Sequence, residues 1–141
     1  MTVPEIIVDE KPDPGQRQAI FTPLLNYNDS RVGPPTLLPF AVFLRDPNNH
    51  TGIGGLWAYS AYDWLFVELL FVPEAMRRHG IGSKLMRHAE DVALKRSCAG
   101  IWLDIYSFQA RGFYEKLGYE IFGALDDFPK GHTRYFFRKL L

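Results

Sequence analysis

Cysteine is almost absent from this sequence, since Cys98 is the only one among 141 residues. A single thiol excludes a disulfide within the chain, and it excludes a metal site built from several thiolates. Histidine is scarce as well, and the four histidines at positions 50, 79, 88 and 132 lack the spacing of metal ligands. We therefore expect no metal in this protein.

An excess of charge of one sign is also lacking. Sixteen Lys and Arg residues balance sixteen Asp and Glu residues, so the formal net charge is zero. The field of the whole molecule then gives no reason for nonspecific attraction to nucleic acid or anionic lipid. We expect neither nucleic acid nor a membrane as a partner, and any anion site must be local.

Long hydrophobic runs are missing, and none approaches the ~20 residues needed to span a bilayer. The N-terminal stretch "MTVPEIIVDEKPDP" carries acids where a secretory signal carries basic residues. The expected location is therefore the cytoplasm. With 47% hydrophobic and 23% charged residues, the composition is that of a globular protein, and we expect one domain over residues 1–141.

What the sequence does contain is a clear alternation of strand and helix patterns. Strands are expected at 6–10, 39–46, 53–61, 64–72, 101–106, 119–123 and 133–141. Helices are expected from 82 to before Gly100 and over about 107–117, with Gly118 as a stop, whereas 15–28 favours one or two short helices interrupted by Pro23. Because a helix separates the strands at 64–72 and 101–106, these two strands should pair in parallel through a right-handed crossover.

The stretch "RRHGIGSK" at 77–84 stands where a strand passes into a helix. The first-turn amides of a helix have no partners within it, so they favour a bound anion. Gly80 and Gly82 leave these amides uncovered, while three basic residues at 77–79 add positive charge. The turn predicts a diphosphate site, although such residues also occur in purely structural turns. Its spacing matches neither the Walker phosphate loop nor the dinucleotide fingerprint.

The longer segment "LLFVPEAMRRHGIGSKLM" resembles the acetyl-CoA signature of the GNAT superfamily of N-acyltransferases. In that signature Arg or Gln, two arbitrary residues, Gly, one arbitrary residue and Gly or Ala follow the fourth strand, and here Arg77, Gly80 and Gly82 take these positions. The resemblance runs from about Phe40 to the C-terminus. It implies the GNAT fold, of the α/β (α+β) class: a mixed, mostly antiparallel sheet of six to seven strands with a splayed parallel central pair, flanked by about four helices.

The resemblance also implies acetyl-CoA as cosubstrate, with its pyrophosphate on the amides of residues 78–83. The residues then expected to bind it are Leu70, Phe71, Val72, Arg77, Arg78, His79, Gly80, Ile81, Gly82, Ser83, Ser107, Gln109 and Tyr114. The family often has an asparagine at the position of Ser107. Ser107 could cap the following helix instead, and Gln109 could supply the missing amide.

Tyr114 lies in "SFQARGFYEKLGYE", which is similar to the family segment whose tyrosine is the general acid to the CoA sulfur. A phenol with a pKa of ~10 is a weaker acid than a thiol near ~8.5, so a hydrogen bond to the thiolate can matter as much as proton transfer. By spacing alone, Tyr114 fits a core position on the apolar stripe with Ala110, Phe113 and Leu117. The resemblance favours the catalytic role.

Glu68 is the one acid in the apolar strand "WLFVELLFV". Histone-acetylating members of the family have a glutamate that looks equivalent and acts as general base. A carboxyl group near ~4.3 is too weak to deprotonate an ammonium near ~10.4, so burial would have to raise its pKa or a water would have to relay the proton. The alternative is an acid on a solvated strand face. The resemblance also makes the amide of Leu70 the expected oxyanion donor, because the family's central strands splay there.

The expected function is an N-acetyltransferase that moves an acetyl group from acetyl-CoA to a primary amine by direct attack in a ternary complex. An acyl-enzyme on Cys98 is disfavoured because no His or Asp stands at triad spacing. The alternative is a catalytically silent CoA-binding or partner-binding module. Fold alone does not choose the acceptor; residues 9–36 and the loop 123–134, with Phe128, His132 and Arg134, are expected to shape its pocket. The family also suggests a homodimer.

Overall fold

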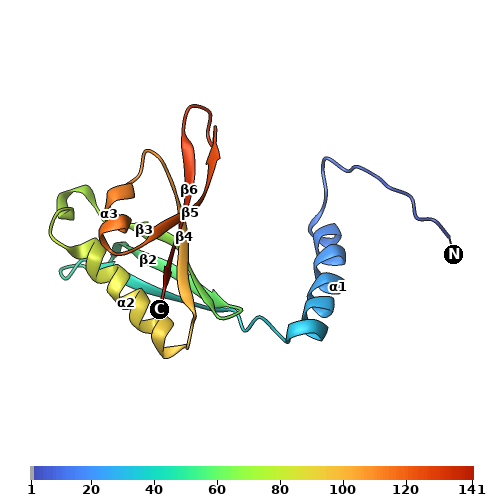
Figure 1. Cartoon of the computed structure of the whole chain (residues 1–141), viewed down its shortest axis with the longest axis horizontal. Helices are drawn as coiled ribbons and strands as arrows, with labels where there is room; N and C mark the ends of the chain where they lie inside the picture. The colour runs from blue at the N-terminus through green and yellow to red at the C-terminus, as the bar shows by residue number, and fades with distance from the viewer. Residues whose placement is uncertain (1) are drawn as a thin grey trace. The chain divides into compact units, whose positions relative to one another are not determined.

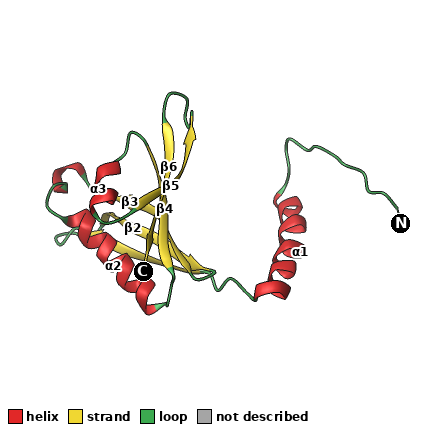
Figure 2. Cartoon of the chain, viewed as in Figure 1, coloured by secondary structure: helices red, strands yellow, loops and turns green. Residues whose placement is uncertain are grey.

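The computed structural model describes residues 2–141 and divides the chain into two units, one ending at Pro35 and the other spanning Thr36–Leu141 (Figure 1). The first unit contains one helix, and the second contains a six-stranded sheet with the remaining helices (Figure 2). No described helix is both long and apolar enough to cross a membrane. The expectation of a single domain over 1–141 stays a prediction.

The helix of the first unit is α1, Pro14–Val32. A capping box starts it: Asp13 Oδ1 accepts from the Gln16 amide at 3.0 Å, and Gln16 Oε1 accepts from the Asp13 amide at 2.7 Å. The expected interruption at Pro23 is wrong, because the helix continues through it. A proline removes one hydrogen bond from the ladder, and the turns on both sides hold the rest. The expected strand at 6–10 is wrong as well, since this segment pairs with no described strand.

The sheet of the second unit has the order β1-β2-β3-β4-β6-β5. Its strands are β1 Leu38–Arg45, β2 Gly52–Ala61, β3 Trp64–Phe71, β4 Gly100–Tyr106, β5 Glu120–Asp126 and β6 Thr133–Leu140. The first three form the expected antiparallel meander. Tyr62 and Asp63 connect β2 to β3 with φ angles of 48° and 66°, as a tight two-residue hairpin turn requires.

Two α-helices and a short 3-10 turn complete the second unit: α2 Ile81–Lys95, α3 Arg111–Lys116 and the turn Glu74–Met76. The helix α2 matches its expected range, but α3 is shorter than the expected 107–117. Residues 107–109 form a turn instead, in which the Tyr106 amide donates to Gln109 Oε1 at 2.9 Å. Gly118 follows α3 at a φ of +91°, so the predicted stop is confirmed.

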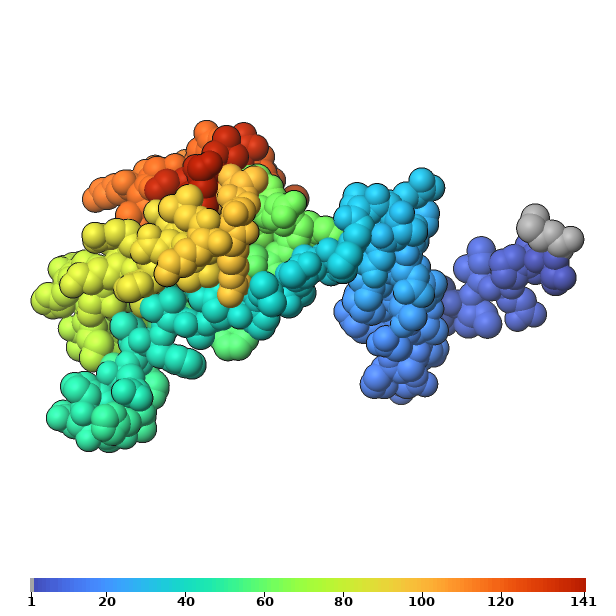
Figure 3. Space-filling view, turned by 90° about the horizontal axis from the view of Figure 1, so that it is seen from below, coloured from blue at the N-terminus to red at the C-terminus, as the bar shows by residue number. Residues whose placement is uncertain are grey.

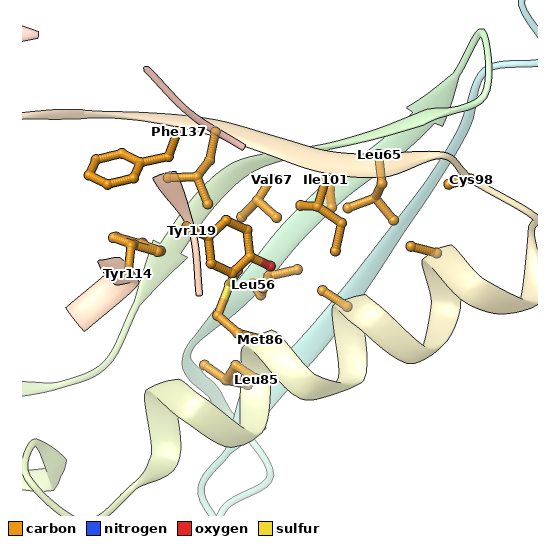
Figure 4. Packing of buried hydrophobic residues seen from close by; sticks show 14 of the residues in the cluster. Leu56, Leu65, Val67, Leu85, Met86, Cys98, Ile101, Tyr114, Tyr119 and Phe137 are labelled. Atoms are coloured by element: carbon orange, nitrogen blue, oxygen red, sulfur yellow. The ribbon is translucent and has the colours of Figure 1, made fainter. Parts of the chain in front are cut away.

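The core lies between α2 and one face of the sheet (Figure 4). The helix buries Leu85, Met86, Ala89 and Ala93, and the strands contribute Leu65, Ile101, Leu103 and Phe137. Each large apolar side chain buried in this way contributes about 1.5–3 kcal/mol relative to exposure. Alternation then places Asp104 and Tyr106 of β4 on the opposite face, since Leu103 and Ile105 are buried.

The C-terminus ties the sheet to α2. The Leu141 amide donates to the Ala99 carbonyl at 3.0 Å, and Figure 3 shows the last residues, in dark red, beside the end of α2. Lys139 Nζ donates to Glu90 Oε1 at 3.1 Å and to the Leu117 carbonyl at 2.9 Å. These contacts fix the helix against the sheet on which the site depends.

Candidate active site

The central parallel pair, β3 and β4, separates after three residues. Only Trp64–Phe66 pair with Gly100–Trp102, so beyond Phe66 the ladder between the two strands stops. A bulge between Trp57 and Ala58 of β2 shifts the register opposite Glu68 in the same stretch. The splayed pair predicted from the family resemblance is thus confirmed.

A cleft of about 1260 Å³ occupies the space where these strands part. Its walls come from both strands, from the turn before α2 and from α3. The lining includes most of the predicted cofactor residues: Leu70, Phe71, Val72, Arg77, Arg78, Gly80, Ile81, Gly82, Ser83, Gln109 and Tyr114. Of the predicted set, His79 and Ser107 are not among the described residues that line it.

The turn before α2 presents the start of that helix to the cleft. Gly80 is its N-cap and has a left-handed φ of 74°, and a Cβ added there would meet no atom within 4 Å. The nearby residue Arg78 is left-handed too, with a φ of 68°. A left-handed N-cap with open space in front exposes the first amides of α2, and such amides are the usual donors to phosphate oxygens.

Gly82 has a second reason to be glycine. An added Cβ would lie 3.1 Å from the ring of Phe113, which comes from α3. The close approach of Phe113 closes one end of the cleft against the start of α2. Sequence analysis assigned Gly82 to ligand access alone and did not anticipate this contact.

Arg77 lines the cleft while its side chain is held by the protein. Its Nε donates to the Val72 carbonyl at 2.9 Å, and its guanidinium lies 5.8 Å from the centre of the Phe71 ring. The side chain therefore fastens the turn to the end of β3. Arg77 supplies both positive charge and the shape of the turn.

Tyr114 combines the two interpretations that its spacing left open. It is 7% exposed and packs at 4.9 Å from the Phe113 ring, as a core residue does, yet it also lines the cleft. Burial raises the pKa of Tyr114 to about 12. The phenol therefore keeps its proton at neutral pH and is available as a hydrogen-bond donor.

Glu68 lines the cleft as an exposed residue. Glu68 is therefore not buried, and burial was the condition for a direct role as general base. A water-relayed role needs no burial, because Glu68 then acts at the end of a solvated path. Glu68 lies near Leu70 on the part of β3 that no longer pairs with β4, and both residues line the cleft.

Ser107 and Gln109 lie in different surroundings: Gln109 lines the cleft, and Ser107 is not among the described residues that line it. The predicted cap by Ser107 is wrong: the N-cap of α3 is Ala110, and Ser107 Oγ accepts from the Thr133 amide at 3.0 Å. A helix that starts four residues later leaves the hydroxyl to the loop before β6. Gln109 lines the cleft and closes the turn after β4.

Sequence analysis missed several cleft residues on the side away from α2. These are Asp104, Tyr106 and Phe108, joined by the anticipated Arg134, whereas Phe113, also missed, lies against the start of α2. Arg134 donates to Asp104 Oδ1 from NH2 at 2.6 Å, and its guanidinium lies 4.7 Å from the Phe128 ring centre. The alternation in "IWLDIY" put Asp104 and Tyr106 on one face, and the resemblance implied the splay, but neither indicated that these two side chains line the cleft.

Cys98 lies away from the cleft. It is buried, and burial raises the pKa of its thiol. Figure 4 shows it at the opposite end of the core from Tyr114. A buried, protonated thiol is a poor nucleophile, which favours transfer without an acyl-enzyme.

The described residues contain no group of three or more His, Cys, Asp and Glu side chains that could hold a metal ion. A sheet split between parallel strands, exposed helix amides at one end of the split and a buried phenol beside it define an enzyme class: acyltransferases that use a phosphate-bearing carrier.

Comparison with known proteins agrees with this class. The sequence model described as the acetyltransferase (GNAT) family matches residues 4–119. Acetyltransferase Atu2258 of Agrobacterium fabrum is 36% identical over 127 residues, which are 90% of this chain and 92% of that protein. Blasticidin-S acetyltransferase of Streptomyces morookaense is 37% identical over 89 residues, 62% of this chain and 65% of that protein.

Solved structures show the same fold. The crystal structure of an acetyltransferase from Bacillus cereus ATCC 14579 has a TM-score of 0.86 at 30% identity and covers 96% of this chain and 98% of its own. An aminoglycoside 6′-N-acetyltransferase complexed with coenzyme A has a TM-score of 0.62 at 22% identity over 72% of each chain, a likeness of fold alone.

The chain belongs to the GNAT family of acetyltransferases and is an acyltransferase enzyme. The family resemblance drawn from "LLFVPEAMRRHGIGSKLM" and the α/β fold class are both confirmed. Structural neighbours in the family bind CoA or acetyl-CoA.

Proposed function

We propose that this protein transfers the acetyl group of acetyl-CoA to a primary amine by direct attack within a ternary complex. The observation that carries the proposal is the cleft between β3 and β4, which has exposed helix amides at one end and the Tyr114 phenol inside. The acceptor enters the same cleft, whose lining includes residues outside the expected cofactor set, such as Tyr106 and Phe108.

The residues present fit acetyl-CoA. The open space in front of Gly80 leaves the amides of residues 78–83 free for a pyrophosphate, and the basic residues 77–79 surround the same turn. Backbone groups of residues 67–71 that face the opened gap have no partner in β4 and suit an amide-bearing pantetheine arm. When bound, acetyl-CoA supplies an activated thioester.

Three residues would act on the transfer. The Leu70 amide, on the part of β3 that pairs with β2 but no longer with β4, donates to the oxyanion. The Tyr114 hydroxyl donates a hydrogen bond to the departing thiolate. With a pKa near 12, Tyr114 is a weaker acid than a thiol at ~8.5, so we favour the hydrogen bond over complete proton transfer. Exposed Glu68 accepts the amine proton through water.

The test measures binding and turnover separately. CoA and acetyl-CoA are titrated calorimetrically into the protein, and thiol release is then followed with a panel of amines that includes blasticidin S and aminoglycosides, the acceptors named for two related proteins. Thiol release with at least one amine supports the proposal. Binding without release across a broad panel would instead favour a silent CoA-binding module, and the absence of binding would overturn both.

The role of Glu68 has its own test. Glu68→Gln should lower kcat across the neutral and alkaline range, because no carboxylate then accepts the relayed proton. Glu120→Gln is the matched control, since Glu120 lies on β5 in an exposed ion pair with Arg138. An unchanged profile in Glu68→Gln would remove Glu68 from the mechanism.

We also propose that the protein is a homodimer. Apolar side chains of the first unit are largely exposed, including Val3 at 83%, Ile6 at 95% and Val8 at 86%. A unit of this length is too short to cover such side chains with its own core. The family match begins at residue 4, so the unit is part of the family's shared chain.

A location in the cytoplasm stays a prediction, testable by cell fractionation.

A further inference from the structure

An aromatic patch lies at the mouth of the cleft on the side of the sheet away from α2. It consists of Tyr106, Phe108 and Phe128. The rings of Tyr106 and Phe108 stack with centroids 5.2 Å apart and an interplanar angle of 7°, and Phe128 lies 5.9 Å from Tyr106. Phe108 is 61% exposed even though it is held in this stack. An ordered ring with an open face is a surface on which another ring can stack.

The patch is held in place by charged and polar neighbours. Arg134 lies over Tyr106 at 5.3 Å and over Phe128 at 4.7 Å from the ring centres, and Asp104 binds its guanidinium. His132 meets the edge of Phe108 at 5.1 Å. The Arg134 guanidinium therefore covers Tyr106 and Phe128, and the face of the Phe108 ring that points away from Tyr106, its outer face, stays open.

The formal charge at this mouth is negative. Asp104 and Arg134 cancel in their ion pair, and Glu68 on the facing strand remains. The other basic residues that line the cleft, Arg77 and Arg78, belong to the turn before α2. A cation is favoured beside Glu68 and an anion beside the turn.

We propose, resting on the acetyl transfer proposed above, that the acceptor is a cationic amine carried on a flat aromatic or heteroaromatic ring. The ring stacks on the outer face of Phe108, and the amine points past Tyr106 into the cleft towards Glu68. Both Phe108 and Glu68 line the same cleft as Tyr114. Linear amines of similar size gain the charge interaction but lose the stacking.

The experiment compares ring-bearing amines, such as tyramine and tryptamine, with linear alkylamines of similar carbon number. Their binding to the protein is measured calorimetrically with and without CoA, and KM is measured where turnover occurs. Phe108→Ala should weaken ring-bearing amines by about 3- to 10-fold and leave linear amines unchanged. Phe108→Trp should restore the preference, because it restores a flat surface.

Phe122→Ala is the matched control. Phe122 is 49% exposed on β5 and is not among the described residues that line the cleft. It should change neither amine class. The proposal is overturned if the wild type binds linear amines as well as ring-bearing ones, or if Phe108→Ala weakens both classes equally. Titrations without CoA separate this failure from a failure of cofactor binding.

Discussion

At the residue scale, Tyr114 joins a place in the core with the catalytic role that we propose for it. Its ring packs against Phe113, Tyr119 and Phe137, and its hydroxyl belongs to a residue that lines the cleft. Burial fixes the position of the hydroxyl and raises its pKa in the same step. A donor fixed before the reaction costs little reorganisation when the thiolate forms.

Tyr114→Phe should therefore lower kcat by about 100-fold, the lower end of the range for loss of a positioned proton donor. The affinity for CoA should stay nearly unchanged, because the ring remains in place. Thiol release and calorimetry measure the two quantities. Tyr119→Phe is the control. Tyr119 is buried, its hydroxyl donates to Glu90 Oε1 at 3.0 Å, and it is not among the described residues that line the cleft, so kcat should not fall. Equal effects of the two variants on kcat would contradict the role of Tyr114.

The same buried phenols make stability sensitive to alkaline pH. Burial raises the pKa of Tyr114 to about 12, and burial together with Glu90 raises the pKa of Tyr119. In the unfolded chain both ionise near ~10. Above that pH the unfolded state releases protons that the native state keeps, so the stability present below pH ~10 is lost as the pH rises towards 12.

We expect the free energy of unfolding to fall by about 1.4 kcal/mol per pH unit for each such phenol in that window. Urea unfolding between pH 8 and 11 measures this slope. Tyr119→Phe should reduce the slope, whereas Tyr62→Phe, at a 46% exposed position, should leave it unchanged. A slope that is the same in all three proteins would contradict the assignment.

At the scale of single elements, the turn before α2 carries the cofactor prediction. A Cβ added at Gly80 or at Gly112 would meet no atom within 4 Å, but only Gly80 has a left-handed φ. Gly80→Ala should lower the free energy of unfolding by about 1 kcal/mol. It should also weaken CoA binding about tenfold, because the strained turn shifts the amides that meet the phosphates.

Gly112→Ala is the paired change in α3. It should raise the free energy of unfolding by about 0.5–1 kcal/mol, since alanine favours a helix over glycine. CoA affinity should not change. Denaturant unfolding and calorimetry on both variants separate the conformational effect from the effect of an added methyl group. Similar behaviour of the two variants would show that the turn does not need its left-handed residue.

The elements themselves differ in how far the sequence predicted them. Residues 81–95 have an apolar stripe with a clear helical period, so α2 lies where it was expected. The helix α3 begins four residues later than predicted. In the turn after β4, Gln109 Oε1 accepts from the Tyr106 amide and Ser107 Oγ accepts from the Thr133 amide, so these residues are not part of the helix. The helix α1 continues through Pro23, which local rules treat as a break.

At the scale of the whole molecule, the proposed homodimer predicts the mass of the protein in solution. Light scattering after gel filtration should give a mass twice that of the 16.2 kDa chain. Ile6→Lys should shift the protein to monomer, because a lysine at this 95% exposed position disfavours apolar contact with a second copy. Glu10→Lys, at an exposed polar position nearby, should remain dimeric. A monomeric wild type would overturn the homodimer.

The amino-acid sequence by itself determined the strand and helix order of residues 38–141 and the glycine-bearing turn for which we propose anion binding. Both depend on short-range features: the period of apolar residues, and glycines placed beside basic residues at a strand end. The fold class and the family followed from the resemblance carried by residues 69–86, which contain this turn. These features act locally, so no knowledge of distant contacts was needed to interpret them.

Only the tertiary structure decided where the sheet opens and which side chains meet there. The parting of β3 and β4 after Phe66 depends on partners far apart in the sequence. It brings Glu68 and Tyr114 into one cleft and places Phe108 and Arg134 at its mouth. The exposure of Glu68 and the burial of Tyr114 depend on this packing too, since the sequence left two interpretations open for each residue.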